Sequence, residues 1–112
     1  MFGFQRLDVY RDSLEFLGVA TRLASSLGRT QAELADQLQR AAMSVPLNIA
    51  EGSGKFTRDA TRYYIIARGS ALECAAIMDV LETLALIDSN RLDGPREVLR
   101  RTIARLTRLA GR

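Results

Sequence analysis

The chain has 112 residues, of which 47% are hydrophobic and 26% are charged, a composition typical of one folded, water-soluble domain. It contains no histidine and one cysteine. Histidine-based acid–base catalysis, the commonest metal ligand and an internal disulfide are therefore excluded. The cysteine, Cys74, lies in an apolar run, where we expect a buried, unreactive thiol. The sequence has neither an apolar run of membrane-spanning length nor the start typical of a signal peptide, so we expect a cytoplasmic protein.

The positive charge is concentrated late in the sequence. The formal net charge is +3, yet residues 1–90 carry 9 basic and 11 acidic side chains, whereas residues 91–112 carry 7 arginines and only two acids. Fifteen of the 16 basic residues are arginine, which forms paired hydrogen bonds with phosphates and carboxylates. An arginine-rich last helix predicts contact with nucleic acid. The alternative is a solvated helix face whose arginines pair with acidic neighbours, and the pattern alone slightly favours it.

Apolar periodicity predicts the first helix over residues 5–27 and the second over residues 31–51. Gly28 is a stop signal for the first helix. Thr30 and Glu33 have the spacing of a capping box at the start of the second. Pro46 lies inside the second helix, and its missing amide hydrogen predicts a kink near residues 42–45.

The third helix is predicted over residues 58–87, with Thr57 as its N-cap. Its apolar side chains point in every direction. A helix that is apolar nearly all round should be covered on more than one side, which one four-helix unit does not provide. We therefore expect this helix to lie at the centre of a subunit interface.

The fourth helix is predicted over residues 95–110, with Pro95 at the tolerated first position. The sequence shows no strand pattern and no internal repeat. We expect residues 1–112 to form a single all-α domain, an antiparallel up-down-up-down four-helix bundle.

The stretch "AEGSGKFT", residues 50–57, resembles a phosphate-binding loop at first sight. A phosphate loop needs two glycines separated by four residues, followed by Lys and Ser or Thr, after a buried strand. Here Gly52 and Gly54 are two apart, Lys55 precedes Phe56, and the preceding segment is helical by period. We interpret the stretch as a turn between antiparallel helices, in which Gly52 or Gly54 adopts the left-handed conformation that ends the second helix.

A polar stripe accompanies the apolar face of the second helix. Its members share a spacing of four, four and three residues: Arg40, Ser44, Asn48 and Glu51. Folding the second helix back on the third brings Arg40 towards Ser70 and Glu73, and brings Glu51 towards Arg58 and Arg62. We expect a partly buried polar network that fixes the register of the hairpin. The alternative is a small-ligand site on this stripe, although a carboxylate without a histidine or a second nearby acid is a poor active site.

The same region carries a family resemblance. The motifs are Arg40-Ala41, Ser44, Asn48-Ile49-Ala50-Glu51-Gly52, Lys55 and Gly69-Ser70-Ala71-Leu72-Glu73. This pattern resembles the bacterial four-helix-bundle proteins related to ribosomal-RNA intervening-sequence proteins, a family that includes accessory variability proteins of retroelements. The resemblance covers the first three helices well and the fourth loosely. It implies a bundle that assembles into a ring, typically a pentamer, and some relatives bind a reverse transcriptase and nucleic acid through a basic ring.

We therefore expect a non-enzymatic homo-oligomer, a pentamer, that presents an arginine-rich surface to RNA, DNA or a nucleic-acid enzyme. The candidate contacts are Arg100, Arg101, Arg105 and Arg108, with Lys55 and Arg58 second. We predict no catalytic residue, no metal and no cofactor. Two alternatives stay open: a purely structural or protein-interaction ring, and a small-ligand binder at the polar stripe.

Overall fold

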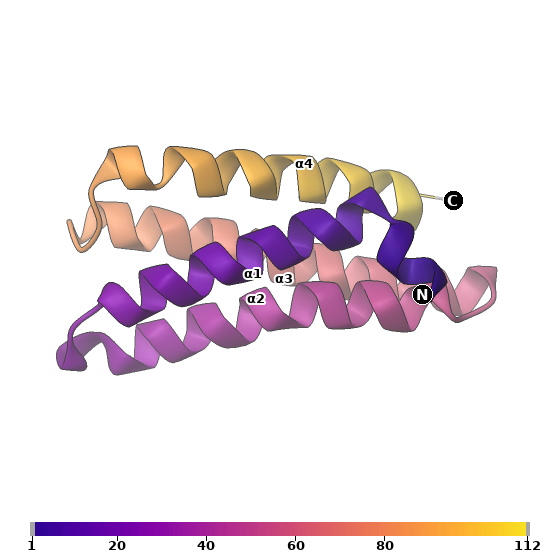
Figure 1. The fold of residues 1–112 in the computed structure, drawn as a ribbon, viewed down its shortest axis with the longest axis horizontal. Helices are drawn as coiled ribbons and strands as arrows, with labels where there is room; N and C mark the ends of the chain where they lie inside the picture. Colours follow the sequence, from indigo (N-terminus) through magenta and orange to yellow (C-terminus); the bar gives the residue numbers. More distant parts are fainter. Residues whose placement is uncertain (1, 112) are drawn as a thin grey trace.

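Four helices make up most of the computed structural model, which describes residues 2–111 (Figure 1). They are α1 (Asp8–Ser26), α2 (Ala32–Ser53), α3 (Thr57–Thr83) and α4 (Asp93–Ala110). Three short 3-10 turns, η1 (Gly3–Arg6), η2 (Arg29–Gln31) and η3 (Ser89–Arg91), adjoin them, and residues 2–111 contain no strand. The predicted all-α bundle is confirmed.

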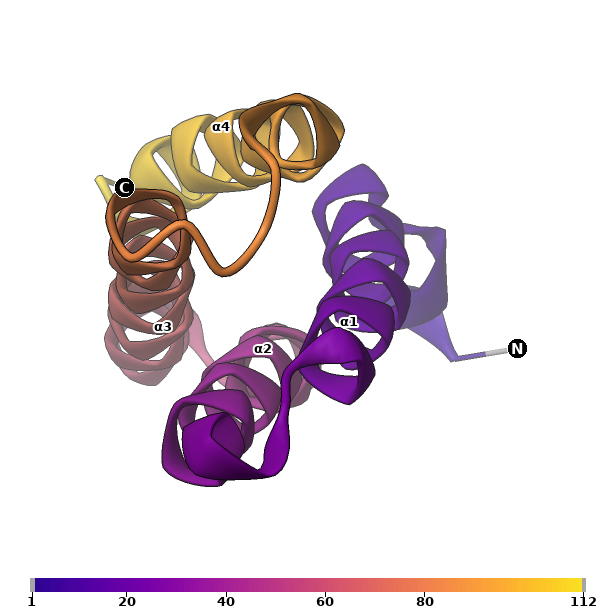
Figure 2. The same ribbon diagram turned by 90° about the vertical axis from the view of Figure 1, so that its left-hand side faces the viewer.

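Consecutive helices run in opposite directions along a body of 43 × 22 × 21 Å (Figure 1). Seen along the bundle, α1 and α3 each lie between α2 and α4 (Figure 2). The N-terminal segment, the α2–α3 turn and the end of α4 consequently share one end of the molecule. We call this the turn end, and we call the opposite end, with η2 and η3, the loop end.

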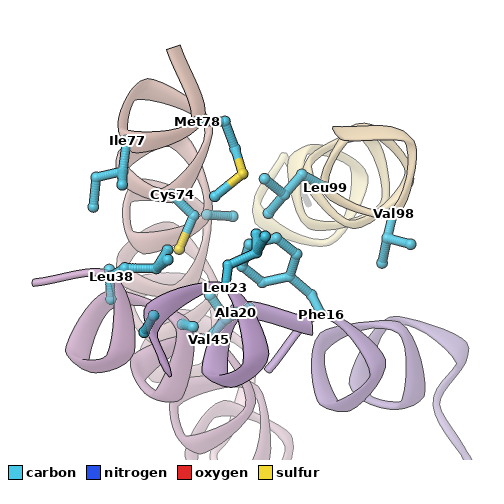
Figure 3. Close-up of a cluster of buried hydrophobic side chains, with 14 of the residues drawn as sticks. Phe16, Ala20, Leu23, Leu38, Val45, Cys74, Ile77, Met78, Val98 and Leu99 are labelled. Carbon is cyan, nitrogen blue, oxygen red and sulfur yellow. The ribbon is translucent and has the colours of Figure 1, made fainter. Parts of the chain in front are cut away.

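All four helices contribute to one apolar core (Figure 3). Five of the six buried positions on α3 follow a spacing of four, three, four and three residues, which places them along one side of the helix: Ala67, Ala71, Cys74, Met78 and Leu81. Phe16 of α1 and Leu99 of α4 pack from the other side of the core. Each fully buried large apolar side chain contributes about 1.5–3 kcal/mol, so this shared core holds the four helices together.

The α2–α3 hairpin turn comprises only residues 54–56, which confirms that the glycine-rich stretch is a turn between helices. The predicted left-handed glycine is wrong, because no glycine within residues 2–111 has a positive φ. Gly52 instead lies buried within α2, where an added Cβ would lie 2.9 Å from Cε1 of Tyr64 and 3.0 Å from Cβ of Tyr63. This glycine allows a close approach of α2 to α3.

Pro46 does not interrupt α2, which is continuous from Ala32 to Ser53. The pyrrolidine ring is buried, and the missing amide hydrogen leaves only the carbonyl of Ala42 without its usual helical donor. Burial of the ring and of the neighbouring Val45 keeps the helix in register with the core.

Two predicted helix caps are wrong. The η2 turn occupies the place of the predicted capping box, and α2 begins at Ala32 without a side-chain cap. The N-cap of α3 is Phe56, so Thr57 is already the first helical residue. Neither α2 nor α3 has a side-chain hydrogen bond at its N-cap.

The third helix ends at Thr83, four residues earlier than predicted. Ala85 adopts a left-handed conformation with φ of 54°. The amide of Leu86 donates to the carbonyl of Leu81, and the amide of Ala85 donates to that of Glu82. These two bonds form a Schellman motif, which normally has glycine at the left-handed position.

Candidate functional site

The arginines at the start of α4 bind acidic side chains of the same molecule. Nη2 of Arg96 lies 3.0 Å from oxygens of both Asp79 and Glu82 at the end of α3. Hydrogen bonding to Arg96 lowers the pKa of Glu82. Arg100 donates two hydrogen bonds to Glu97 on its own helix, at 2.9 and 2.6 Å. These contacts reduce the charge that Arg100 offers to a partner.

Arg101 and Arg105 are tied to α1. Both approach Asp12, at 3.4 and 2.6 Å, and the Asp12 side chain is only 15% exposed. This carboxylate therefore joins α1 to the outer side of α4. Removing one member of a partly buried ionic cluster leaves the others unpaired, which gives these arginines a structural role.

Three other predicted cations lie at the turn end. Arg108 lies in the last turn of α4, and together with Arg105 it lines a small hollow over Leu7 and Val9. Lys55 lies 3.8 Å from Glu51 and 5.8 Å from the centre of the Tyr63 ring. Arg58 is exposed in the first turn of α3 and has no ion pair within residues 2–111.

The polar stripe forms a small hydrogen-bonded cluster between α2 and α3. The hydroxyls of Ser44 and Ser70 share a hydrogen bond of 2.8 Å. The Asn48 amide donates to the backbone carbonyl of Ser44 at 2.8 Å and to its hydroxyl at 3.0 Å. The cluster links the two helices of the hairpin, and most of its polar groups form hydrogen bonds with one another.

The charged members of that stripe have other partners than predicted. Arg40 pairs with Asp36 at 3.3 Å, one turn earlier on α2, although it shares a surface hollow with Ser70 and Glu73. Glu51 pairs with Lys55 rather than with the arginines of α3. Both pairs are largely exposed and contribute little to stability. The interhelical link is thus the hydrogen bond between the hydroxyls of Ser44 and Ser70, and the Asn48 amide binds Ser44 from within α2.

The charge of the molecule is distributed by end rather than by helix. The turn end carries seven basic side chains, Arg6, Arg11, Lys55, Arg58, Arg62, Arg105 and Arg108, against four acidic ones, Asp8, Asp12, Glu51 and Asp59. The loop end carries seven acidic side chains, Glu33, Asp36, Asp79, Glu82, Asp88, Asp93 and Glu97, against five arginines, Arg22, Arg29, Arg91, Arg96 and Arg100. The net charges are +3 and −2. Sequence reasoning missed this because α4 runs the full length of the bundle and starts at the acidic end.

A row of apolar side chains remains uncovered on α3. Ile65, Leu72 and Val80 are 56%, 42% and 40% exposed, and their spacing of seven and eight residues keeps them on one side of the helix. A second uncovered apolar area belongs to other helices and includes Leu14 of α1 and Leu47 of α2. We call these the α3 row and the α1–α2 face.

Two exposed phenylalanines at the turn end escaped the sequence reasoning. Phe56 is 94% exposed and Phe2 is 73% exposed. Phe56 follows Lys55 directly. The sequence alone does not show that this pair lies on a turn that projects from the end of the bundle (Figure 1).

Residues 2–111 contain no cluster of metal-ligating side chains, and none of their helices is long and apolar enough to cross a membrane. No curated protein matches the chain. The family described as 23S rRNA-intervening sequence protein matches residues 5–108. This match spans nearly the whole length of the bundle, α4 included up to its last turn. The chain therefore belongs to the 23S rRNA-intervening sequence protein family.

Proposed function

We propose that this protein is a non-enzymatic homo-oligomer, a pentamer, that presents a basic surface to nucleic acid or to an enzyme that acts on nucleic acid. The observation that carries the proposal is the net charge of +3 at the turn end. The family description, which names a ribosomal-RNA element, agrees with such a role. The principal contacts we propose are Lys55, Arg58 and Arg62, with Arg108 beside them at the turn end; the Lys55 pair with Glu51 is largely exposed. They replace Arg100, Arg101 and Arg105, which are engaged by acidic side chains of the same molecule.

Assembly is supported by the two uncovered apolar areas. The α3 row and the α1–α2 face lie on different helices, so a contact between them joins unlike surfaces of two copies. Such a contact closes into a ring when the rotation between copies permits it. If the bundles stand side by side around the ring axis, every turn end faces the same way. The basic ends then form one continuous surface, and several weak phosphate contacts act together.

Binding should be measured by fluorescence anisotropy with labelled RNA and DNA of mixed sequence, on protein whose mass has been determined by light scattering. We expect an oligomer whose affinity falls steeply between about 0.05 and 0.2 M salt. A triple variant with glutamate at Lys55, Arg58 and Arg62 should bind about tenfold more weakly or worse. The slope of log affinity against log salt concentration should become smaller by about 2, since each single-strand phosphate contact contributes about 0.7.

The matched control changes Arg22, Arg29 and Arg91 to glutamate. These exposed arginines lie at the loop end, so the net charge changes equally while the turn end stays intact. If both variants lost the same amount of affinity, the loss would follow from the change in net charge alone, and the turn end would not be the binding site. Absence of binding at low salt by the unaltered oligomer would remove the nucleic-acid role and leave a ring whose partner is a protein.

A further inference from the structure

The turn end has an aromatic cavity beside its basic side chains. It lies between η1, the end of α2 and the start of α3, and has a volume of about 600 Å³, within the range typical of small-ligand sites. Its walls include Phe2, Phe4, Leu7 and Tyr64, and Gly54 of the turn lies at its edge. No other described cavity combines aromatic walls with this position on the molecule.

The aromatic walls are ordered by contacts among themselves. The rings of Phe2 and Phe4 stack with their centres 5.9 Å apart and their planes 5° from parallel. Phe4 in turn meets Tyr10 edge-on at 5.0 Å. The amide of Phe2 donates to Oε1 of Gln5 at 2.6 Å. These contacts hold the Phe2 ring as a wall of the cavity although the side chain itself is 73% exposed.

A further aromatic side chain follows the cavity lining along the chain. Phe56 lies two residues beyond Gly54 and is almost fully exposed. A single exposed ring is ordinary, but Phe56 shares this end of the bundle with the exposed Phe2 and the aromatic cavity, and exposed apolar side chains that gather in one area indicate an interaction surface. Lys55 precedes Phe56 and Arg58 follows it after one residue, so the aromatic side chain lies between two cationic ones in the sequence.

We propose that this aromatic cavity and Phe56 bind the bases of a single-stranded nucleic acid, while the neighbouring cations contact its phosphates. The inference rests on the function proposed above and specifies its ligand. Proteins that bind single strands combine a basic surface with aromatic rings on which bases stack. An RNA duplex keeps its bases stacked on one another and offers only phosphates, sugar hydroxyls and groove edges. The basic charge around the cavity disfavours the basic end of a second copy as the occupant.

The test compares a single-stranded RNA of mixed sequence with the duplex of the same sequence, at one salt concentration, by fluorescence anisotropy. Three proteins are compared: the unaltered oligomer, Phe2→Ala/Phe56→Ala and Phe2→Leu/Phe56→Leu. Leucine keeps the apolar bulk but removes the π-face, so both variants should lose single-strand affinity about 10- to 100-fold. Duplex affinity should change less than about twofold, because phosphate contacts dominate it.

The outcomes separate this inference from the proposed function. Unchanged single-strand affinity in both variants, with binding still sensitive to Lys55, Arg58 and Arg62, overturns base stacking and leaves the basic site in place. A smaller oligomer for the alanine variant but not for the leucine variant assigns the rings to a contact between copies, and also overturns the inference. Failure of the unaltered protein to bind either RNA removes this inference together with direct RNA binding, and leaves a protein partner as the remaining part of the proposed function.

Discussion

Gly52 illustrates how a residue without a side chain fixes the distance between two helices. Gly52→Ala places a methyl group 3.0 Å or less from atoms of Tyr63 and Tyr64. Overpacking of this kind costs about 1–3 kcal/mol, which outweighs the gain of about 1 kcal/mol from replacing a helical glycine. We expect a net loss of unfolding free energy in urea denaturation.

The matched control for this substitution is Gly18→Ala in the middle of α1. A Cβ there meets only Nη1 of Arg22, at 3.6 Å, so the gain in helix propensity should appear uncompensated as about 0.5–1 kcal/mol of added stability. Stabilisation by both substitutions would contradict the close α2–α3 contact.

Cys74 should be chemically silent in the folded protein. Burial, with a smaller contribution from Glu73, raises the pKa of its thiol to about 12, so the reactive thiolate is absent near neutral pH. A thiol reagent at pH 8 should label the protein only as fast as it unfolds. Rapid labelling of the native protein would contradict the buried position.

The same shift makes stability depend on pH. The unfolded thiol loses its proton above pH 9.0, whereas the folded thiol keeps it up to about pH 12. The unfolded state therefore binds fewer protons in this interval, and stability falls as the pH rises through it. Cys74→Ala should show a shallower decline between pH 8 and 10.5 in the same denaturation assay, because other titrating groups are unchanged.

The end of α3 contains a strained residue that the sequence does not reveal. A left-handed conformation costs a residue with a Cβ about 1–2 kcal/mol, and Ala85 adopts it to complete the Schellman motif. Ala85→Gly relieves this strain, and the larger entropy that glycine loses on folding offsets part of the gain, so the substitution should stabilise the protein by about 0.5–1 kcal/mol. Ala76→Gly, at an exposed position inside α3, should instead destabilise the protein by a similar amount. In thermal denaturation the melting temperature should therefore rise for Ala85→Gly and fall for Ala76→Gly.

The helices themselves were predictable because apolar spacing persists over four or more turns, and each observed helix overlaps its predicted range. The helix ends were less predictable. Gly28 indicates the end of α1, but no glycine or proline marks the end of α3 before Ala85. The start of α3 follows Phe56, a residue with no capping side chain, because the geometry of the hairpin decides where the helix can begin.

The candidate site was predictable only in part. Spacing placed Ser44 and Asn48 on one side of α2, since residues four apart share one side of a helix, and the predicted antiparallel hairpin brought that side towards Ser70. The partners of the α4 arginines depend on which acidic residues of α1 and α3 lie opposite, and no local pattern contains that information. Asp12 is separated from Arg105 by most of the sequence. The exposed phenylalanines likewise acquire meaning only from their common position at one end of the bundle.

Assembly should depend on the α3 row. Ile65→Glu/Leu72→Glu places two charges where we propose that a second copy packs, and burying an unpaired charge is strongly unfavourable. Light scattering should give the mass of a single folded chain, with an unchanged circular dichroism spectrum because both positions are exposed in the isolated bundle. Ser25→Glu at an exposed site of α1 should leave the oligomer intact. An oligomer that survives the double substitution would place the interface elsewhere.

The separation of charge between the two ends gives each chain an electric dipole along its 43 Å axis. The helix dipoles add little to it, because neighbouring helices are antiparallel and largely cancel. In a ring of side-by-side bundles all these dipoles are parallel, and parallel neighbours repel. Salt screens that repulsion, since the Debye length shortens from about 30 Å at 0.01 M to about 8 Å at 0.15 M. Added salt should therefore raise the affinity between copies in the ring while it lowers the affinity of the ring for a polyanion.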